Sequence, residues 1–94
     1  MAFLFEKLEA YKKAVAFAAK IDSLYSKLPR GKYFTVDQLR RASLSISLNI
    51  AEGNGRWHKG DKRQFFAVAR GSTFECVPIL ELLKRGAIST VKPF

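Results

Sequence analysis

Residues 39–56 read LRRASLSISLNIAEGNGR, a helical segment that ends in a glycine-rich corner. Its apolar residues recur at intervals of three and four, the period of an α-helix that buries one side. This core stripe consists of Leu39, Ala42, Ile46 and Ile50. Leu44 and Leu48 lie off the stripe, so the helix has apolar contacts on more than one side and lies centrally or at an interface. Gly53 suits the left-handed conformation that closes many helices.

The same period predicts a helix on each side of this segment. The first covers residues 5–28, and Pro29 ends it. Its stripe consists of Leu8, Tyr11, Ala14, Val15, Ala18, Ile21, Leu24, Tyr25 and Leu28. The last covers residues 61–85, with a kink at Pro78 and an end at Gly86. Its inner stripe consists of Phe65, Val68, Ala69, Cys76, Leu80 and Leu83.

Helices at about 5–28, 36–52 and 61–85, with short connections and no alternating strand pattern, predict one fold class. We expect a single all-α domain over residues 1–94, an antiparallel up-down helical bundle. Thr35 and Gln38 have the spacing of a capping box at the start of the middle helix. Gly71 costs about 1 kcal/mol inside a helix, so we expect it to allow a close crossing against Ala42, Ser43 or Ser47.

Size and charge narrow the classes of function. A chain of 94 residues with three helices leaves apolar surface poorly covered, which favours self-association. The formal net charge of +9 favours polyanionic partners such as nucleic acid. A single cysteine and the lack of a secretory signal indicate the cytoplasm. The longest uncharged run, residues 42–51, is half the roughly 20 residues that span a membrane.

Three stretches together resemble a known family. FEKLEAYKKAV, QLRRASLSISLNIAEGNGR and FFAVARGSTFECVPILELLKR are similar to the four-helix-bundle protein family, also called the 23S ribosomal RNA intervening-sequence protein family. The resemblance implies a ring-shaped homopentamer without known enzymatic activity. It also implies a relationship to the basic accessory protein of diversity-generating retroelements, which works with nucleic acid and a reverse transcriptase.

The chain departs from that family in two places. The family's fourth helix would follow the LLKR stretch, but only nine residues remain after Arg85, so this helix is absent or truncated. The pentamer is correspondingly less strongly implied. His58 stands where the family tends to place a serine helix cap, which leaves Asp61 or the connection itself to satisfy the first amides of the last helix.

The glycine-rich corner has two interpretations. A phosphate loop needs a lysine and a hydroxyl residue after its last glycine, usually behind a strand, and GNGRWHKGDK has neither feature. The ordinary interpretation is therefore a corner between helices. A weaker phosphate site remains open, in which amides at the start of the last helix act together with Arg56, Lys59, Lys62 and Arg63.

A second basic group surrounds the first connection and includes Arg40 and Arg41. Both groups are interpreted either as a solvated surface or as a contact for nucleic-acid phosphates. Trp57 and His58 either stack on an unpaired base or, in the case of the tryptophan, fold back over the end of the bundle.

Arg41, Ser45, Asn49 and Glu52 form a polar strip along the middle helix at spacings of four, four and three. We expect Glu52 and Asn49 to approach Arg70, with Ser45 in the same network. This would be a partly buried network that sets the helix register. Catalysis by Glu52 is disfavoured because no second acid or base shares its face.

Neither a metal nor a cofactor is expected. His58 and Cys76 are too far apart along one helix to meet, and Cys76 lies on an apolar stripe, where it packs as a small hydrophobe.

Two functions follow from these patterns. The first is a non-enzymatic basic bundle that self-assembles through Leu44 and Leu48 and binds RNA or DNA through phosphate contacts. The second is a scaffold that docks a protein partner on the same leucines and on the face that lacks a fourth helix, with no physiological role for nucleic acid.

Overall fold

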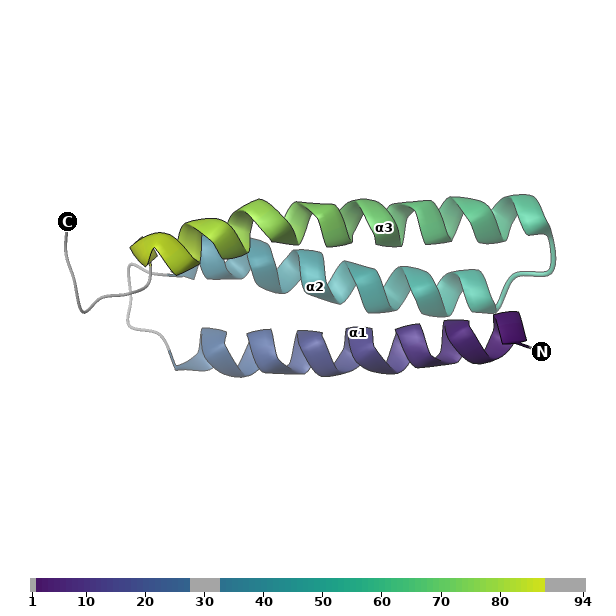
Figure 1. The fold of residues 1–94 in the computed structure, drawn as a ribbon, viewed down its shortest axis with the longest axis horizontal. Helices are drawn as coiled ribbons and strands as arrows, with labels where there is room; N and C mark the ends of the chain where they lie inside the picture. The colour runs from purple at the N-terminus through teal and green to yellow at the C-terminus, as the bar shows by residue number, and fades with distance from the viewer. Residues whose placement is uncertain (1, 28–32, 88–94) are drawn as a thin grey trace.

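The computed structural model of the chain describes residues 2–27 and 33–87. Its elements are α1 (Ala2–Ser26), α2 (Tyr33–Asn54), α3 (Lys59–Leu82) and a short π-helix, η1 (Leu83–Ala87). Successive helices run in opposite directions, so the start of α1 lies at the same end as the connection between α2 and α3 (Figure 1). The described residues contain no strand. This confirms the predicted all-α up-down bundle.

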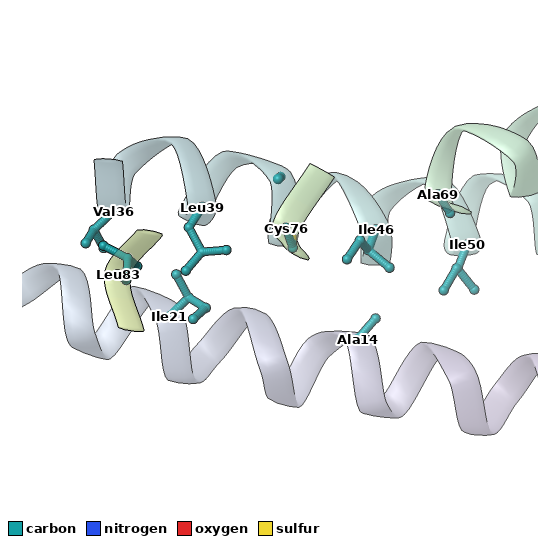
Figure 2. Packing of buried hydrophobic residues seen from close by; sticks show 10 residues of the cluster. Ala14, Ile21, Val36, Leu39, Ile46, Ile50, Ala69, Cys76 and Leu83 are labelled. Carbon is teal, nitrogen blue, oxygen red and sulfur yellow. The ribbon is translucent and has the colours of Figure 1, made fainter. Parts of the chain in front are cut away.

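Helix α2 is the central element. It packs along both α1 and α3, whereas α1 and α3 make few contacts with each other. All four residues of its predicted stripe are buried, and Val36 extends the stripe by one turn. Figure 2 shows Ile46 and Ile50 pointing from α2 toward α1. The sequence pattern therefore identified the helix on which the core is built.

The outer helices bury narrower stripes than their sequences predict. Of the described stripe residues of α1, only Ala14 and Ile21 are buried, while Leu8 and Val15 are 47% and 42% exposed. In α3, Val68 and Leu80 are similarly exposed. The reason is that α1 and α3 each pack mainly on α2, so each needs only one narrow contact face. Leu28 and Pro29 lie outside the described residues.

Small residues allow close packing on α2, but at a different place from the one expected. Gly71 is exposed, and a Cβ atom there would meet no other group within 4 Å, so the expected close crossing at Gly71 is wrong. Ala42, Ser43 and Ser47 of α2 are all buried. Ser47 lines a shallow groove with Val15 of α1, so the small side chains of α2 admit α1.

The start of α2 also differs from the prediction. Because α2 begins at Tyr33, Thr35 lies inside the helix and is not its cap, so the capping-box prediction is wrong. Asp37, in the second turn, instead accepts hydrogen bonds from the guanidinium groups of Arg40 and Arg41. These bonds do not close the end of α2, and Arg40 also reaches α1, where it lies 3.9 Å from Asp22 Oδ1.

Helix α3 continues through Pro78, as predicted, and changes at Leu83 to the π-helix η1. Gly86 lies inside η1, so it does not end the helix. Pro78 has no amide hydrogen to donate to the carbonyl of Phe74, which weakens the helix at that turn. In Figure 1 the yellow-green end of α3 inclines toward α2. This inclination brings Leu83 into the core beside Val36 (Figure 2).

None of the helices, over the part of the chain that the structure describes, is long and apolar enough to span a lipid bilayer.

Candidate nucleic-acid interface

The glycine-rich corner is a tight connection between two helices. The amide of Gly55 donates to the carbonyl oxygens of Ala51 and Glu52 at 3.2 Å each, and the amide of Arg56 donates to Gly53 O, also at 3.2 Å. At the start of α3, the amide of Lys62 donates to His58 O at 3.0 Å. These bonds hold the ends of α2 and α3, so the few residues between them have a defined path.

Gly53 has a role other than the predicted left-handed cap. It is buried inside α2, and its backbone does not adopt the left-handed conformation. A Cβ atom at this position would lie 2.5 Å from Cε1 and 2.8 Å from Cδ1 of Phe66. Gly53 is therefore required because the ring of Phe66 in α3 packs directly on the backbone of α2.

Lys62 supplies the cap that the glycine does not. Its Nζ donates to Gly53 O at 3.2 Å and to Asn54 O at 3.3 Å, two carbonyl groups at the carboxyl end of α2. A cation at this end of a helix also interacts favourably with the helix dipole. Lys62, predicted as a phosphate ligand, thus stabilises the corner by bonding to carbonyl groups of the protein itself.

The other residues of the predicted basic group differ in their surroundings. Arg56 pairs with Glu52 at 3.0 Å, and its guanidinium lies 4.7 Å from the centre of the Phe65 ring. Lys59 and Arg63 are exposed, and no described carboxylate pairs with either. Lys59 and Arg63 are thus the two residues of this group that present their charge outward.

The structure adds two cations that were not assigned to this site. Lys7 Nζ lies 4.2 Å from the centre of the Phe66 ring, and Arg70 lines a cleft together with Lys7, Arg63 and Phe66. Within α3, a spacing of four, three and four residues places Lys59, Arg63, Phe66 and Arg70 on one side of the helix. That signal is present in the sequence. The contribution of Lys7 depends on the antiparallel course of α1 and was not predictable from spacing.

We call these residues the loop-end cluster: Lys7, Lys59, Lys62, Arg63 and Arg70 with the aromatic residues Trp57 and Phe66. Two adjoining clefts lie within it. The Trp57 cleft has a volume of about 530 Å³ and is lined by Trp57, Lys59, Lys62, Arg63 and Phe66. The Arg70 cleft has a volume of about 570 Å³ and is lined by Lys7, Arg63, Phe66, Ala67 and Arg70. None of the lining residues is acidic, so the cluster concentrates positive charge.

The two remaining predicted cations, Arg40 and Arg41, lie elsewhere. Arg40 Nη2 is 2.8 Å from Asp37 Oδ1, and Arg41 Nε is 3.1 Å from Asp37 Oδ2. The hydrogen bond from Arg40 keeps the pKa of the Asp37 carboxyl below its ordinary value. Arg40 also contacts the Tyr25 ring, at 4.5 Å from its centre. At about 1.5 Å per residue, Arg41 lies roughly 20 Å along α2 from the corner, so the two basic groups do not form one surface.

Of the four residues predicted to form a polar network, only Ser45 and Asn49 are joined, and Ser72 takes part in place of Arg70. Asn49 Nδ2 donates to Ser45 O and Ser45 Oγ at 2.8 and 3.1 Å, and Ser72 Oγ donates to Ser45 Oγ at 2.8 Å. Ser72 of α3 is therefore the partner across the helices, in place of Arg70.

Glu52 does not join this network, because it is exposed and pairs with Arg56. The register explains the difference. Since Ser45 is level with Ser72, Arg70 is two residues nearer the corner and therefore level with Ser47, five residues from Glu52. The expected approach of Glu52 to Arg70 is wrong for this reason, and Asn49 bonds to Ser45 instead of Arg70.

His58 and Cys76 have separate surroundings. His58 is the N-cap residue of α3, with extended backbone, and its side chain makes no capping hydrogen bond. Cys76 is buried, and burial raises the pKa of its thiol, with a further contribution from Glu75. Within the described ranges, no three His, Cys, Asp or Glu side chains are grouped closely enough to hold a metal ion.

The comparisons with known proteins give one result for the family. The family model described as 23S rRNA-intervening sequence protein matches residues 6–93. No curated protein and no solved structure compared with the chain matches it.

Proposed function

We propose a function from the premise that the chain belongs to the 23S rRNA-intervening sequence protein family. The protein is non-enzymatic, is located in the cytoplasm and binds RNA or DNA through phosphate contacts. In this proposal it self-associates, and a ring of copies presents several basic sites to one nucleic acid. Five such copies would match the assembly implied by the family resemblance. Several weak sites on one particle raise the effective concentration of each, which increases the overall affinity.

The loop-end cluster is the observation that carries the proposal. It gathers five cationic residues from α1 and α3 around the aromatic side chains of Trp57 and Phe66, and none of the residues lining its clefts is acidic. A polyanion is the partner that such a surface attracts, because neutralising phosphates with Lys and Arg releases counterions. The net charge of +9 adds a long-range attraction of the same sign.

An exposed apolar groove and an opening onto the core support self-association. On one side of α2, a groove along α1 is lined by Val15, Leu44 and Leu48 among others, and the two leucines are 48% and 55% exposed. On the other side, the core residues Ile46 and Ile50 line an opening between α1 and α3. Contact between apolar side chains and water is unfavourable at both places. A second copy of the chain that covers either place removes that contact.

The second candidate function is a protein-binding scaffold, and a different surface favours it. Helix α3 exposes apolar side chains away from the loop-end cluster, including Phe74, Val77 and Leu82, which are 66%, 59% and 57% exposed. A protein partner could cover them without any nucleic acid. The salt titration that follows separates these functions, and the second experiment tests self-association.

The logarithm of the affinity for nucleic acid is expected to fall linearly with the logarithm of the salt concentration. The slope should be about 0.9 per neutralised duplex phosphate and about 0.7 per phosphate of a single strand. Replacing Lys59 and Arg63 together by alanine should lower the slope by roughly 1.4 to 1.8. Fluorescence anisotropy of a labelled oligonucleotide, at several salt concentrations, measures both quantities.

The matched control replaces Lys13 and Lys20, two exposed lysines of α1 that do not line either cleft. It removes the same net charge. If both double variants lower the slope equally, the phosphate contacts are not concentrated at the loop-end cluster. If the unchanged protein does not bind at low salt, the proposed nucleic-acid function is wrong.

Self-association is expected to depend on the groove that contains Leu44. The substitution Leu44→Asp places a charge in a contact that must exclude water, so the mass measured by light scattering should fall toward that of one chain. Circular dichroism should show that the helices remain, because Leu44 lies outside the core. Val77→Asp is the matched control on α3. An unchanged mass for Leu44→Asp would show that another surface holds the copies together.

A further inference from the structure

We propose that the Trp57 cleft binds an unpaired base, so that the preferred partner of the protein is a single-stranded stretch of nucleic acid and not a duplex. This inference rests on the proposed function, and it specifies which form of nucleic acid the loop-end cluster takes. It begins from Trp57, the only tryptophan in the chain, which is 93% exposed.

The backbone that carries the exposed indole is held in place by hydrogen bonds on both sides. Trp57 lies between Arg56, whose amide bonds to Gly53 O, and His58, whose carbonyl accepts the bond from the Lys62 amide. The Lys62 side chain also joins α3 to the end of α2. The backbone on each side of Trp57 is thereby fixed to a helix, and a ligand does not have to order the connection before it binds.

The shape and lining of the cleft fit one nucleotide. Aromatic rings from Trp57 and Phe66 line the cleft, and Lys59 and Arg63 lie among its other lining residues. Its volume of about 530 Å³ is within the range of roughly 300 to 1,000 Å³ that is usual for ligand sites. A base offers a flat apolar face to the rings, and its phosphate offers negative charge to the cations.

The preference for a single strand over a duplex follows from how accessible the face of a base is in each. In a duplex, base faces are stacked on their neighbours, so an exposed tryptophan gains little from it beyond contacts at the edges. In a single strand, bases are free to stack on aromatic side chains, a contact worth about 1 to 3 kcal/mol per base. The adjoining Arg70 cleft shares Arg63 and Phe66 with the Trp57 cleft, so the next phosphates along the strand can follow α3 toward Arg70.

Because Trp57 is the only tryptophan, its fluorescence tests the proposal directly on the unaltered protein. We expect oligo(dT) and oligo(U) to quench the emission at low salt, since DNA and RNA share a base face and a phosphate. Stronger quenching by one of them identifies the preferred polymer. A hairpin duplex of equal length and low loop content should change the emission little.

Substitution gives a second readout, measured by anisotropy of labelled strands. Trp57→Ala should weaken binding to the single strands about five- to a hundredfold, the range expected for loss of one stacked base. Binding to the duplex should change less than twofold. Trp57→Phe should recover part of the loss. Phe74→Ala, which removes an exposed ring elsewhere on α3, is the matched control and should have no effect.

The outcomes separate this inference from the function on which it rests. If single strands bind with the expected salt dependence, but the emission and the Trp57→Ala affinity are unchanged, the inference is wrong and the proposed function stands. If neither strands nor duplex bind at low salt, both are wrong. A change of emission with phosphatidylserine vesicles but not with the oligonucleotides would likewise overturn the inference, because it would assign Trp57 to a lipid surface.

Discussion

Replacing Leu39 by alanine is expected to lower the free energy of unfolding by about 2 to 5 kcal/mol, the range measured for large-to-small changes in buried sites. Leu39 has no exposed surface and belongs to the same core cluster as Ile21 of α1 and Leu83 of η1. In Figure 2 these three residues and Val36 gather at one end of the core. A cavity at Leu39 therefore weakens packing among three helical elements at once.

Urea titration followed by circular dichroism measures this change. Small domains have a total stability of about 5 to 15 kcal/mol, so the variant is expected to lose a large part of it and should also be studied at low temperature. Leu44→Ala removes the same atoms from the same helix at a half-exposed site, and it should cost about 1 kcal/mol or less in dilute protein. If both variants lose the same free energy of unfolding, Leu39 does not belong to the core and the placement of the core is wrong.

Replacing Gly53 by leucine is expected to destabilise the protein by about 1 to 3 kcal/mol, the usual cost of overpacking. Even the Cβ atom would lie 2.5 Å from the Phe66 ring, so the ring must leave its place on α2. Because Phe66 lines both clefts of the loop-end cluster, the same change should also weaken binding to nucleic acid. Urea titration and anisotropy measure the two effects.

A double-mutant cycle isolates the cause. With Phe66 replaced by alanine, the steric conflict is removed, and Gly53→Ala should then stabilise the helix by up to about 1 kcal/mol through its higher helix propensity. The control is Gly71→Ala, which adds a Cβ atom in open space inside α3 and should be stabilising in the unchanged protein. If Gly53→Ala stabilises the unchanged protein as much as Gly71→Ala does, the close contact with Phe66 does not constrain position 53.

Much of the fold was predictable because each helix shows its period in local sequence. All four predicted stripe residues of α2 are buried, since this helix packs on both neighbours, and only Val36 at its start was missed among its buried apolar residues. The stripes of α1 and α3 were predicted too wide. Periodicity shows which residues share a side of a helix, but it does not show how many neighbours cover that side.

The candidate site was predictable only in part. The basic residues of the corner were identified, but their individual roles depend on distances across helices. Lys62 reaches back to the last carbonyl groups of α2, and Arg56 pairs with Glu52, so neither presents its charge as Lys59 and Arg63 do. Lys7 enters the cluster only because α1 runs antiparallel to α2 and starts at the corner.

By itself, the amino-acid sequence determined three amphipathic helices, their order, the position of the corner and the excess of positive charge, because all of these depend on neighbours within a few turns. Only the tertiary structure decided that Gly53 makes room for Phe66, that Ser72 and not Arg70 completes the polar network, and that Trp57 stays exposed beside the cations. These outcomes depend on helix register and on the separation of helix axes. A shift of two residues or a few ångströms changes which side chains meet.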